Sequence, residues 1–577
     1  MPYKIGVSSG WWGFDKPGEL LGIPMKIGSF GATLGTTFIQ VDLETTSEFF
    51  EPNLKQKLMR YKKELGMELG LHGEIGELMG LESGQRRIWE QSHLRLCETV
   101  KNAAELEMVF VNIHMSQSVQ LWQEEERMKP FGHTVQVVSP DGRPFPEFCE
   151  VSPAAKAEAK KHIMGEMGRK SSSYDPEVYD KKEDALEAEL NRGVAEGLEA
   201  FKRSPEFQAR QREWAQAIEA EKLMERRRDR ERQAVAELQG ILAREEERLR
   251  RQTNENYGRR LRNPDFQYDV WKESRFGRYF IEWGEIGAYH VVAAHMKGTG
   301  DTLWRSLCGN DDPQTAYLGN QKGFNAAVAM KYIEGHLTAK SAHNEKHLGG
   351  KTILEWLKEK KLYLCFEIPE VERPGSESLM RLYNPLDFHI LLMKVGSSYL
   401  KLCSDFEHMI SQKMEPEKII KDSPSDFGKY IYVFHLGKPI PYMGKAHIQI
   451  PVPSRSMEVL YRWLYALRKK GFVDGYMIYE RGGGKNPLEV MQQSVWALRQ
   501  IMSHLEKDVA PDELPETFYG ISEMNKDMYA RQLTAMREHA WDPLAGLISI
   551  PEEAHTFLSR SAVEKGKAEE WKRARFR

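Results

Sequence analysis

Six short, mainly apolar segments of this chain each lead to a residue that can bind a metal ion. One of them, residues 400–403, is followed by Asp405, and His408 lies three residues further on. An aspartate at a strand end commonly caps a helix or starts a turn, so this pair alone is weak evidence for a metal site. The other five segments end in the same way on imidazole or carboxylate side chains: His72, His114, Glu367, His435 and Glu480. The repetition predicts one shared metal site, to which His447, a short loop after His435, also contributes.

The segments before these residues have the composition of buried parallel strands. A strand of a parallel β/α barrel is covered on both faces, so it is apolar throughout and polar residues begin where it ends. The carboxyl ends of all the strands meet at one rim, where this fold holds its active site. Further strands are predicted at 3–8 and 37–43, and helices at 54–65 and 83–106. We therefore predict an α/β protein with a (β/α)8 TIM barrel.

The alternation of strands and helices stops after the fourth predicted strand, which ends at His114. A chain of 577 residues is also longer than one hydrophobic core usually organises. We predict that the barrel is interrupted by a large, mainly helical insertion and followed by a C-terminal extension. The predicted order is the first half of the barrel (residues 1–116), the insertion (117–319), the second half of the barrel (320–506) and the extension (507–577).

The insertion contains a highly charged segment at about 154–262 and a globular base at about 270–319. Apolar residues in 154–262 recur at helical or heptad-like spacing, which predicts a coiled-coil-like helical arm. One hypothesis is a solvated antiparallel hairpin or a coil that binds a second copy or another protein, and the other is a nucleic-acid clamp. Glutamates interspersed with the arginines favour the first. His290 and His295, in the base, lack the strand-end pattern and are predicted to be structural.

Strand-to-helix loops lie on the catalytic face of this fold, so the arm is predicted to rise beside the metal site and to select the substrate or a partner. The net charge of −3 and the pI near 6.7 give no global attraction to nucleic acid or membranes. The five scattered cysteines suit reduced thiols. The amino-terminal segment lacks a signal-peptide pattern, and no apolar run is long enough to span a bilayer. We expect a cytoplasmic protein without membrane contact.

The ordered set of metal-binding side chains resembles the endonuclease IV family of xylose-isomerase-like barrels, also known as AP endonuclease family 2. The resemblance covers residues 1 to about 116 and 350 to about 485. It implies a (β/α)8 fold and, as in the nucleases of the family, a cluster of three zinc ions that cleaves DNA on the 5′ side of an abasic site. The positions that match the family's ligands, in its order, are His72, His114, Glu367, Asp405, His408, His435, His447 and Glu480.

The chain departs from the family's pattern at the third metal and at the DNA-binding loops. Lys445 stands where the family has the aspartate of its Asp-x-His motif, and an ammonium group has no lone pair for a metal. We expect fewer tightly bound metals than three, with Lys445 contacting a substrate anion instead. Residues 73–77 lack the tyrosine, and 45–47 the arginine, that the nucleases insert into DNA. Abasic-site recognition therefore has the least support from the sequence.

Mixed imidazole and carboxylate ligands suit zinc, with manganese as an alternative. Glu367, in the middle of the series, can bridge two ions, and Glu480 or Glu367 can orient a hydroxide for attack on a phosphodiester. The leading hypothesis is a nuclease-like phosphoesterase with two or three zinc ions. A second is a sugar isomerase or epimerase that needs one ion, held by four of these residues: Glu367, Asp405, His435 and Glu480. A third is an interaction module that keeps its metals as structure and works through its helical arm.

Overall fold

The computed structural model describes most of the chain, in several separate ranges. These are residues 3–9, 36–43, 53–73, 80–116, 118–123, 135–166, 176–273, 280–281, 284–371, 375, 377–437, 450, 455–480, 487–515 and 518. The chain forms two compact units. The first consists of residues 1–79, 96–117 and 354–577, and the second of residues 80–95 and 118–353. The second unit thus takes in residues on both sides of the predicted insertion 117–319.

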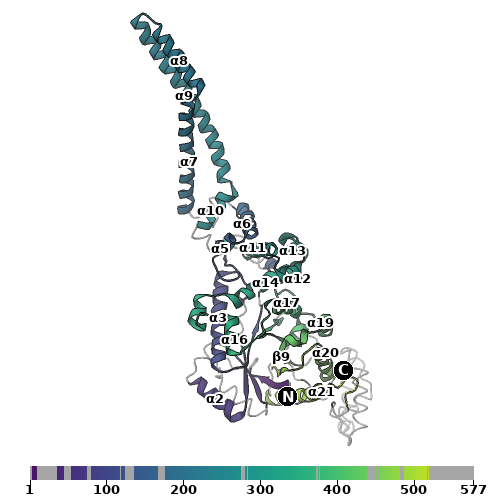
Figure 1. Ribbon diagram of the computed structural model, residues 1–577. Coiled ribbons are helices and arrows are strands. Elements are labelled where there is room, and N and C mark those ends of the chain that lie inside the picture. Colours follow the sequence, from purple (N-terminus) through teal and green to yellow (C-terminus); the bar gives the residue numbers. More distant parts are fainter. Residues whose placement is uncertain are drawn as a thin grey trace, which may run out of the picture. The chain divides into compact units, whose positions relative to one another are not determined.

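The first unit contains a closed barrel of eight parallel strands (Figure 1). Around the barrel the strands follow the order β1-β10-β9-β8-β7-β4-β3-β2. Their bounds are β1 Tyr3–Ser8, β2 Phe38–Asp42, β3 Glu68–His72, β4 Phe110–His114, β7 Tyr363–Glu367, β8 Leu400–Asp405, β9 Ile431–Leu436 and β10 Gly475–Tyr479. The predicted (β/α)8 class is confirmed, and the long interruption does fall between the fourth and fifth barrel strands, β4 and β7.

The strand register brings the ends of neighbouring strands to the same level. Asp42 pairs with His72, His114 with Glu367, and Asp405 with His435. Because side chains two residues apart in a strand share a face, the inward residues form layers inside the barrel. Below the strand ends lies an apolar cluster, called here the apolar layer, that consists of Phe38, Phe110, Cys365, Cys403, Val433, Tyr476 and Ile478. This packed layer closes the barrel below the residues at the strand ends.

Glycine makes room for the aromatic rings of that layer. A Cβ atom at Gly70 would lie 2.5 Å from the Phe110 ring, and one at Gly6 would lie 2.4 Å from the Phe38 ring. At the amino-terminal end of the barrel the next inward layer is polar, with Lys4 paired to Glu68. The interior is therefore a filled core with one polar cluster at each end.

Helices surround the barrel in the first unit and make up most of the second. α3 Arg86–Glu105 is divided equally between the two units. The helices with all or most of their residues in the first unit are α2 Leu54–Leu65, α16 Ile353–Lys360, α17 Pro385–Val395, α18 Phe406–Ser411, α19 Pro416–Asp422, α20 Arg455–Lys469 and α21 Pro487–Glu506, with the 3₁₀ helix η4 Phe427–Tyr430. The five cysteines are buried and free, as expected for reduced thiols. Among the described helices, none is both long and apolar enough to cross a membrane.

The second unit contains the remaining helices and a small antiparallel pair of strands, β5 Val135–Gln136 and β6 Phe280–Ile281. Its helices are α5 Phe145–Glu150, α6 Pro153–Glu166, α7 Pro176–Lys202, α8 Pro205–Glu219, α9 Met224–Leu261, α10 Pro264–Glu273, α11 Gly284–Thr299, α12 Thr302–Cys308, α13 Pro313–Gly319, α14 Gln321–Thr338 and α15 Ala342–Leu348. α14 packs on α11 and α12, so residues beyond 319 belong to this core.

The charged arm is an antiparallel hairpin in which α9 runs back along α7 and α8 (Figure 1). Glu189 of α7 pairs with Arg260 near the end of α9, and Arg210 of α8 pairs with Glu237 nearer its start. This order of pairing is that of antiparallel helices. Four apolar residues of these helices are buried, namely Leu186, Val194, Phe207 and Ala234, whereas Val235 is 54% exposed. The hairpin of the first sequence hypothesis is present, and its binding role stays a prediction.

Candidate metal centre

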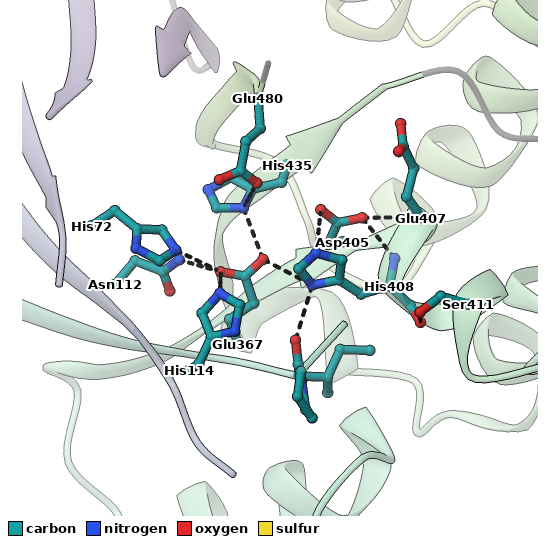
Figure 2. A network of polar contacts seen from close by, with 12 residues as sticks. His72, Asn112, His114, Glu367, Asp405, Glu407, His408, Ser411, His435 and Glu480 are labelled. Carbon is teal, nitrogen blue, oxygen red and sulfur yellow. Dashed lines mark hydrogen bonds and ion pairs between the residues drawn. The ribbon is translucent and has the colours of Figure 1, made fainter. Parts of the chain in front are cut away.

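Seven of the eight predicted ligands lie in the part of the chain that the structure describes, and all seven lie at the carboxyl-terminal rim of the barrel (Figure 2). These are His72, His114, Glu367, Asp405, His408, His435 and Glu480. The position of each follows from the shared strand register, because each stands at or just after the end of its strand. His447 and Lys445 lie outside the described residues, as do the loops 45–47 and 74–77, so the third metal and the role of Lys445 remain predictions.

Glu367 lies at the centre of this cluster and has no exposed surface. Its Oε2 atom faces His72 Nε2 at 3.3 Å and His114 Nε2 at 3.5 Å, and accepts a hydrogen bond from the Asn112 amide. Its Oε1 atom faces His435 Nδ1 at 2.8 Å and His408 Nδ1 at 3.4 Å. The two carboxylate oxygens therefore face two different pairs of imidazoles (Figure 2).

Two sets of imidazole and carboxylate donors overlap at Glu367, and a third set combines Glu367 and His435 with the thiol of Cys403. In the first, donor atoms of His72, His114 and Glu367 all lie within 4.8 Å of one another. In the second, the same holds for Glu367, Asp405, His435 and Glu480, with Glu480 Oε2 at 2.8 Å from His435 Nδ1. A divalent ion bound by two imidazoles and a carboxylate, or by an imidazole and three carboxylates, has the mixed shell that zinc and manganese accept.

Asp405 caps a helix with one of its two carboxylate oxygens, as one of the two roles considered for it from the sequence requires. Its Oδ1 atom caps α18 by accepting from the backbone N–H groups of Glu407 at 2.6 Å and His408 at 3.0 Å. Its Oδ2 atom lies 3.8 Å from His408 Nε2. One oxygen therefore starts the helix that carries His408, and the other remains on the side of the site. The Asp-x-x-His spacing is explained by this geometry, since the cap positions the imidazole beside the carboxylate.

Two of the histidines, His72 and His435, are held in orientations that suit metal ligands. A carbonyl oxygen can only accept, so each ring nitrogen that faces one must carry the proton. His72 donates through Nδ1 to the Gly73 carbonyl at 2.9 Å, and His435 through Nε2 to the Gln40 side chain at 2.9 Å. Their other nitrogens face Glu367. A second hydrogen bond of this kind is the usual support of a metal-binding imidazole, so the residues present fit divalent ions.

The buried carboxylates set the charge of the imidazoles. Burial by itself lowers the pKa of His72, but its hydrogen bond to Glu367 and the charge of that carboxylate raise the pKa to about 9. The pKa of His408 is likewise about 9, because Asp405 and Glu367 outweigh burial. Burial dominates at His114 and lowers its pKa to about 3. A proton on His72 thus supplies positive charge where the first donor set would hold a cation, and a proton on His408 supplies it beside the second set.

Sequence reasoning missed three buried polar residues on the same rim: Gln40, Asp42 and Asn112. Gln40 Nε2 donates to Asp42 Oδ1 at 3.1 Å, and Ser8 also donates to Asp42. Burial raises the pKa of Asp42 above its ordinary value. The two-residue period of the strands is the sequence signal that identifies two of them. Asn112 precedes His114 by two positions, and Gln40 precedes the strand end Asp42 by two, so both must face the barrel interior.

No protein-family model matches this chain, and no curated protein matches its sequence. Solved structures with some likeness include a D-tagatose 3-epimerase-like protein, with 10% identity, 88% of this chain and 100% of that chain covered, and a TM-score of 0.40. A D-psicose 3-epimerase in the presence of D-fructose has 11% identity, coverage of 87% and 99%, and a TM-score of 0.39. An L-ribulose 3-epimerase has 9% identity, coverage of 88% and 96%, and a TM-score of 0.38.

These three structures are of sugar epimerases or an epimerase-like protein, the class of the second sequence hypothesis. Likeness at this level of identity and TM-score does not indicate an activity for this chain. The barrel itself is established by its own strand order and register.

Proposed function

We propose that this protein is a divalent-metal enzyme that hydrolyses a phosphoester, with Glu367 shared between two metal-binding sets. One observation carries the proposal. The Oε2 atom of Glu367 faces His72 and His114, whereas its Oε1 atom faces a separate set that includes His435. A carboxylate whose two oxygens face different sets of ligands is placed to bridge two ions, and two-ion sites are typical of phosphoester hydrolysis.

Zinc or manganese ions in these sets would polarise the phosphoryl group and lower the pKa of a water molecule toward neutrality. The residues of the chain would do the rest. Glu480, which lies beside His435, would orient the attacking water, and the apolar layer beneath the rim would exclude bulk water from below. Lys445 is proposed to contact the substrate phosphate. Gln40 accepts a hydrogen bond from His435 Nε2, so Nδ1 is the nitrogen with which His435 would bind an ion between the carboxylates.

The test is metal content per chain together with an activity panel. The purified protein is analysed for zinc and manganese and is assayed on abasic DNA, RNA, simple phosphodiesters and ketoses. We expect at least two ions at the rim and cleavage of a phosphoester. Metal binding without turnover on any of these substrates would count against the enzyme and favour the interaction module.

A second candidate is a sugar isomerase or epimerase that uses a single ion. The observation that favours it is the compact set of Glu367, Asp405, His435 and Glu480, which forms a complete four-ligand site without His72 and His114. In such an enzyme, paired glutamates would move a proton next to a carbonyl group. Glu367 and Glu480 both lie beside His435 and could act as that pair.

Replacing the two early histidines separates the candidates. In the double variant His72→Ala, His114→Ala, the two-ion hydrolase should lose one metal ion, and its kcat/KM should fall at least ~100-fold. A single-ion isomerase should keep its metal and much of its activity, because the four-ligand set is intact. Unchanged metal content together with unchanged phosphoesterase activity would contradict the proposed hydrolase.

A further inference from the structure

A second cluster of metal-binding side chains lies in the second unit, where α6 packs on α11. Glu158 and His162 are four residues apart on α6, and His290 is on α11. One donor atom from each of the three lies within 4.8 Å of the other two. These two helices share extensive contact, so the arrangement depends on a packed helix pair.

The surroundings of His290 leave one of its ring nitrogens unused. The residue is 3% exposed, and its Nδ1 atom has no hydrogen-bond partner among the described residues. The ring packs against Tyr317, at 4.9 Å between centroids, and Phe324, at 5.0 Å. A buried ring nitrogen without a partner costs free energy, so such groups usually bind water or an ion.

The α6 residues supply charge and a second imidazole. Glu158 Oε1 lies 3.2 Å from His162 Nε2, and Glu158 Oε2 pairs with Lys161 at 2.8 Å. These partners lower the pKa of Glu158 to about 2, so the carboxylate is ionised. Burial lowers the pKa of His290 to about 4, so its imidazole is neutral at pH 7 and has a free lone pair.

We propose that Glu158, His162 and His290 bind a zinc ion. Two imidazoles and a carboxylate are a common three-ligand set for zinc, which completes its tetrahedron with water. From the sequence, His290 is predicted to be structural because it lacks the strand-end pattern. A metal site built from facing helices follows helical spacing instead, so that pattern does not apply to it.

The position of the site in the chain indicates a structural role for the zinc. α6 precedes the hairpin α7–α9, and α11 follows it after α10, all within the second unit. An ion bound to both α6 and α11 would join the two flanks of the charged hairpin. The zinc would therefore stabilise the base of the arm in the way that a structural metal cross-links a fold.

The test compares the full-length wild type with two site variants and one control. His290→Phe keeps an aromatic ring against Tyr317 and Phe324 but removes the donor nitrogens, and Glu158→Gln keeps the shape of the side chain without its charge. The control is His295→Gln on the same helix, whose imidazole contacts the Ser152 hydroxyl at 2.9 Å. Each protein is dialysed against buffered zinc, and bound zinc per chain and unfolding temperature are measured.

We expect both site variants to bind about one zinc fewer than the wild type and the control, and to gain less in unfolding temperature when zinc is added. With the metal chelated, folded variants should unfold at nearly the wild-type temperature. If His290→Phe does not fold, the zinc content of Glu158→Gln alone tests the proposal. Unchanged zinc content in the folded site variants, or the same loss in His295→Gln, would overturn the proposal. A chain carrying Glu367→Gln should retain this zinc, which separates this site from the barrel centre.

Discussion

Among the described residues, two clusters of buried histidines differ in their electrostatics, one at the barrel rim and one in the second unit. At the barrel rim, four imidazoles surround Glu367, and the pKa values of His72 and His408 rise to about 9. In the second unit, His93 and His336 stack with Trp89, and their Nδ1 atoms lie 3.1 Å apart. Burial lowers the pKa of His93 to about 4 and that of His336 well below its ordinary value.

The difference lies in the partners of the rings. His93 Nε2 contacts the amide oxygen of Asn344 at 2.8 Å, a neutral acceptor that cannot balance a positive charge. The rim imidazoles face ionised carboxylates, which stabilise a proton or a metal cation in the same position. Proximity of histidines therefore does not define a metal site. What separates the two clusters is buried negative charge.

The largest expected effect is the loss of the central carboxylate at the rim. Glu367→Gln keeps the shape of the side chain but removes the charge that both donor sets share. We expect the loss of bound metal and a fall in activity of at least about a thousandfold. The far-ultraviolet circular dichroism should be unchanged, because the apolar layer beneath the rim is intact. The control is Glu68→Gln at the opposite end of the barrel, which should keep both metal and activity. Full activity in Glu367→Gln would contradict the conclusion that buried negative charge makes the rim cluster a metal site.

An intermediate effect is expected from the residue that orients His435. Gln40→Leu removes the acceptor of the His435 Nε2 proton, so the ring can rotate or change tautomer. Metal affinity should fall by about 10- to 100-fold, the usual cost of losing such a support. Metal titration in competition with a chelator measures this change. Gln40→Glu keeps an acceptor at that position and should bind metal more tightly than Gln40→Leu. Equal affinities for Gln40→Leu and the wild type would show that His435 needs no second partner.

The smallest expected effect concerns the second cluster and pH. The pKa of His93 is about 4 in the folded state and near 6.5 when unfolded, so folding favours the neutral ring. This stability is complete above pH 6.5 and is lost as the pH falls from 6.5 toward 4. The loss between pH 7 and pH 5 should be about 2 kcal/mol. Urea unfolding at both pH values tests it, and His93→Gln should reduce the difference. Equal stability at pH 7 and pH 5 would mean that His93 is not held neutral.

Much of the barrel and its rim follows from local sequence. An apolar segment that ends on His or Glu encodes both a buried strand and the point where the strand emerges, since both depend on neighbouring residues in one strand. Parallel topology then brings these ends to one rim, so widely separated ligands could be predicted together. Gln40 and Asn112 were predictable by the same logic, because the two-residue period alone assigns them to the interior.

Other features depended on contacts between segments that no local pattern links. That the two oxygens of Glu367 face different imidazoles depends on the register of β7 with its neighbours and on side-chain rotamers. That His290 meets Glu158, whereas His93 meets Asn344, depends on which helices pack together. The sequence by itself determined which residues can bind metal and the fold that gathers those at the strand ends. Only the tertiary structure decided which histidines face buried carboxylates, because long-range packing controls desolvation and charge pairing.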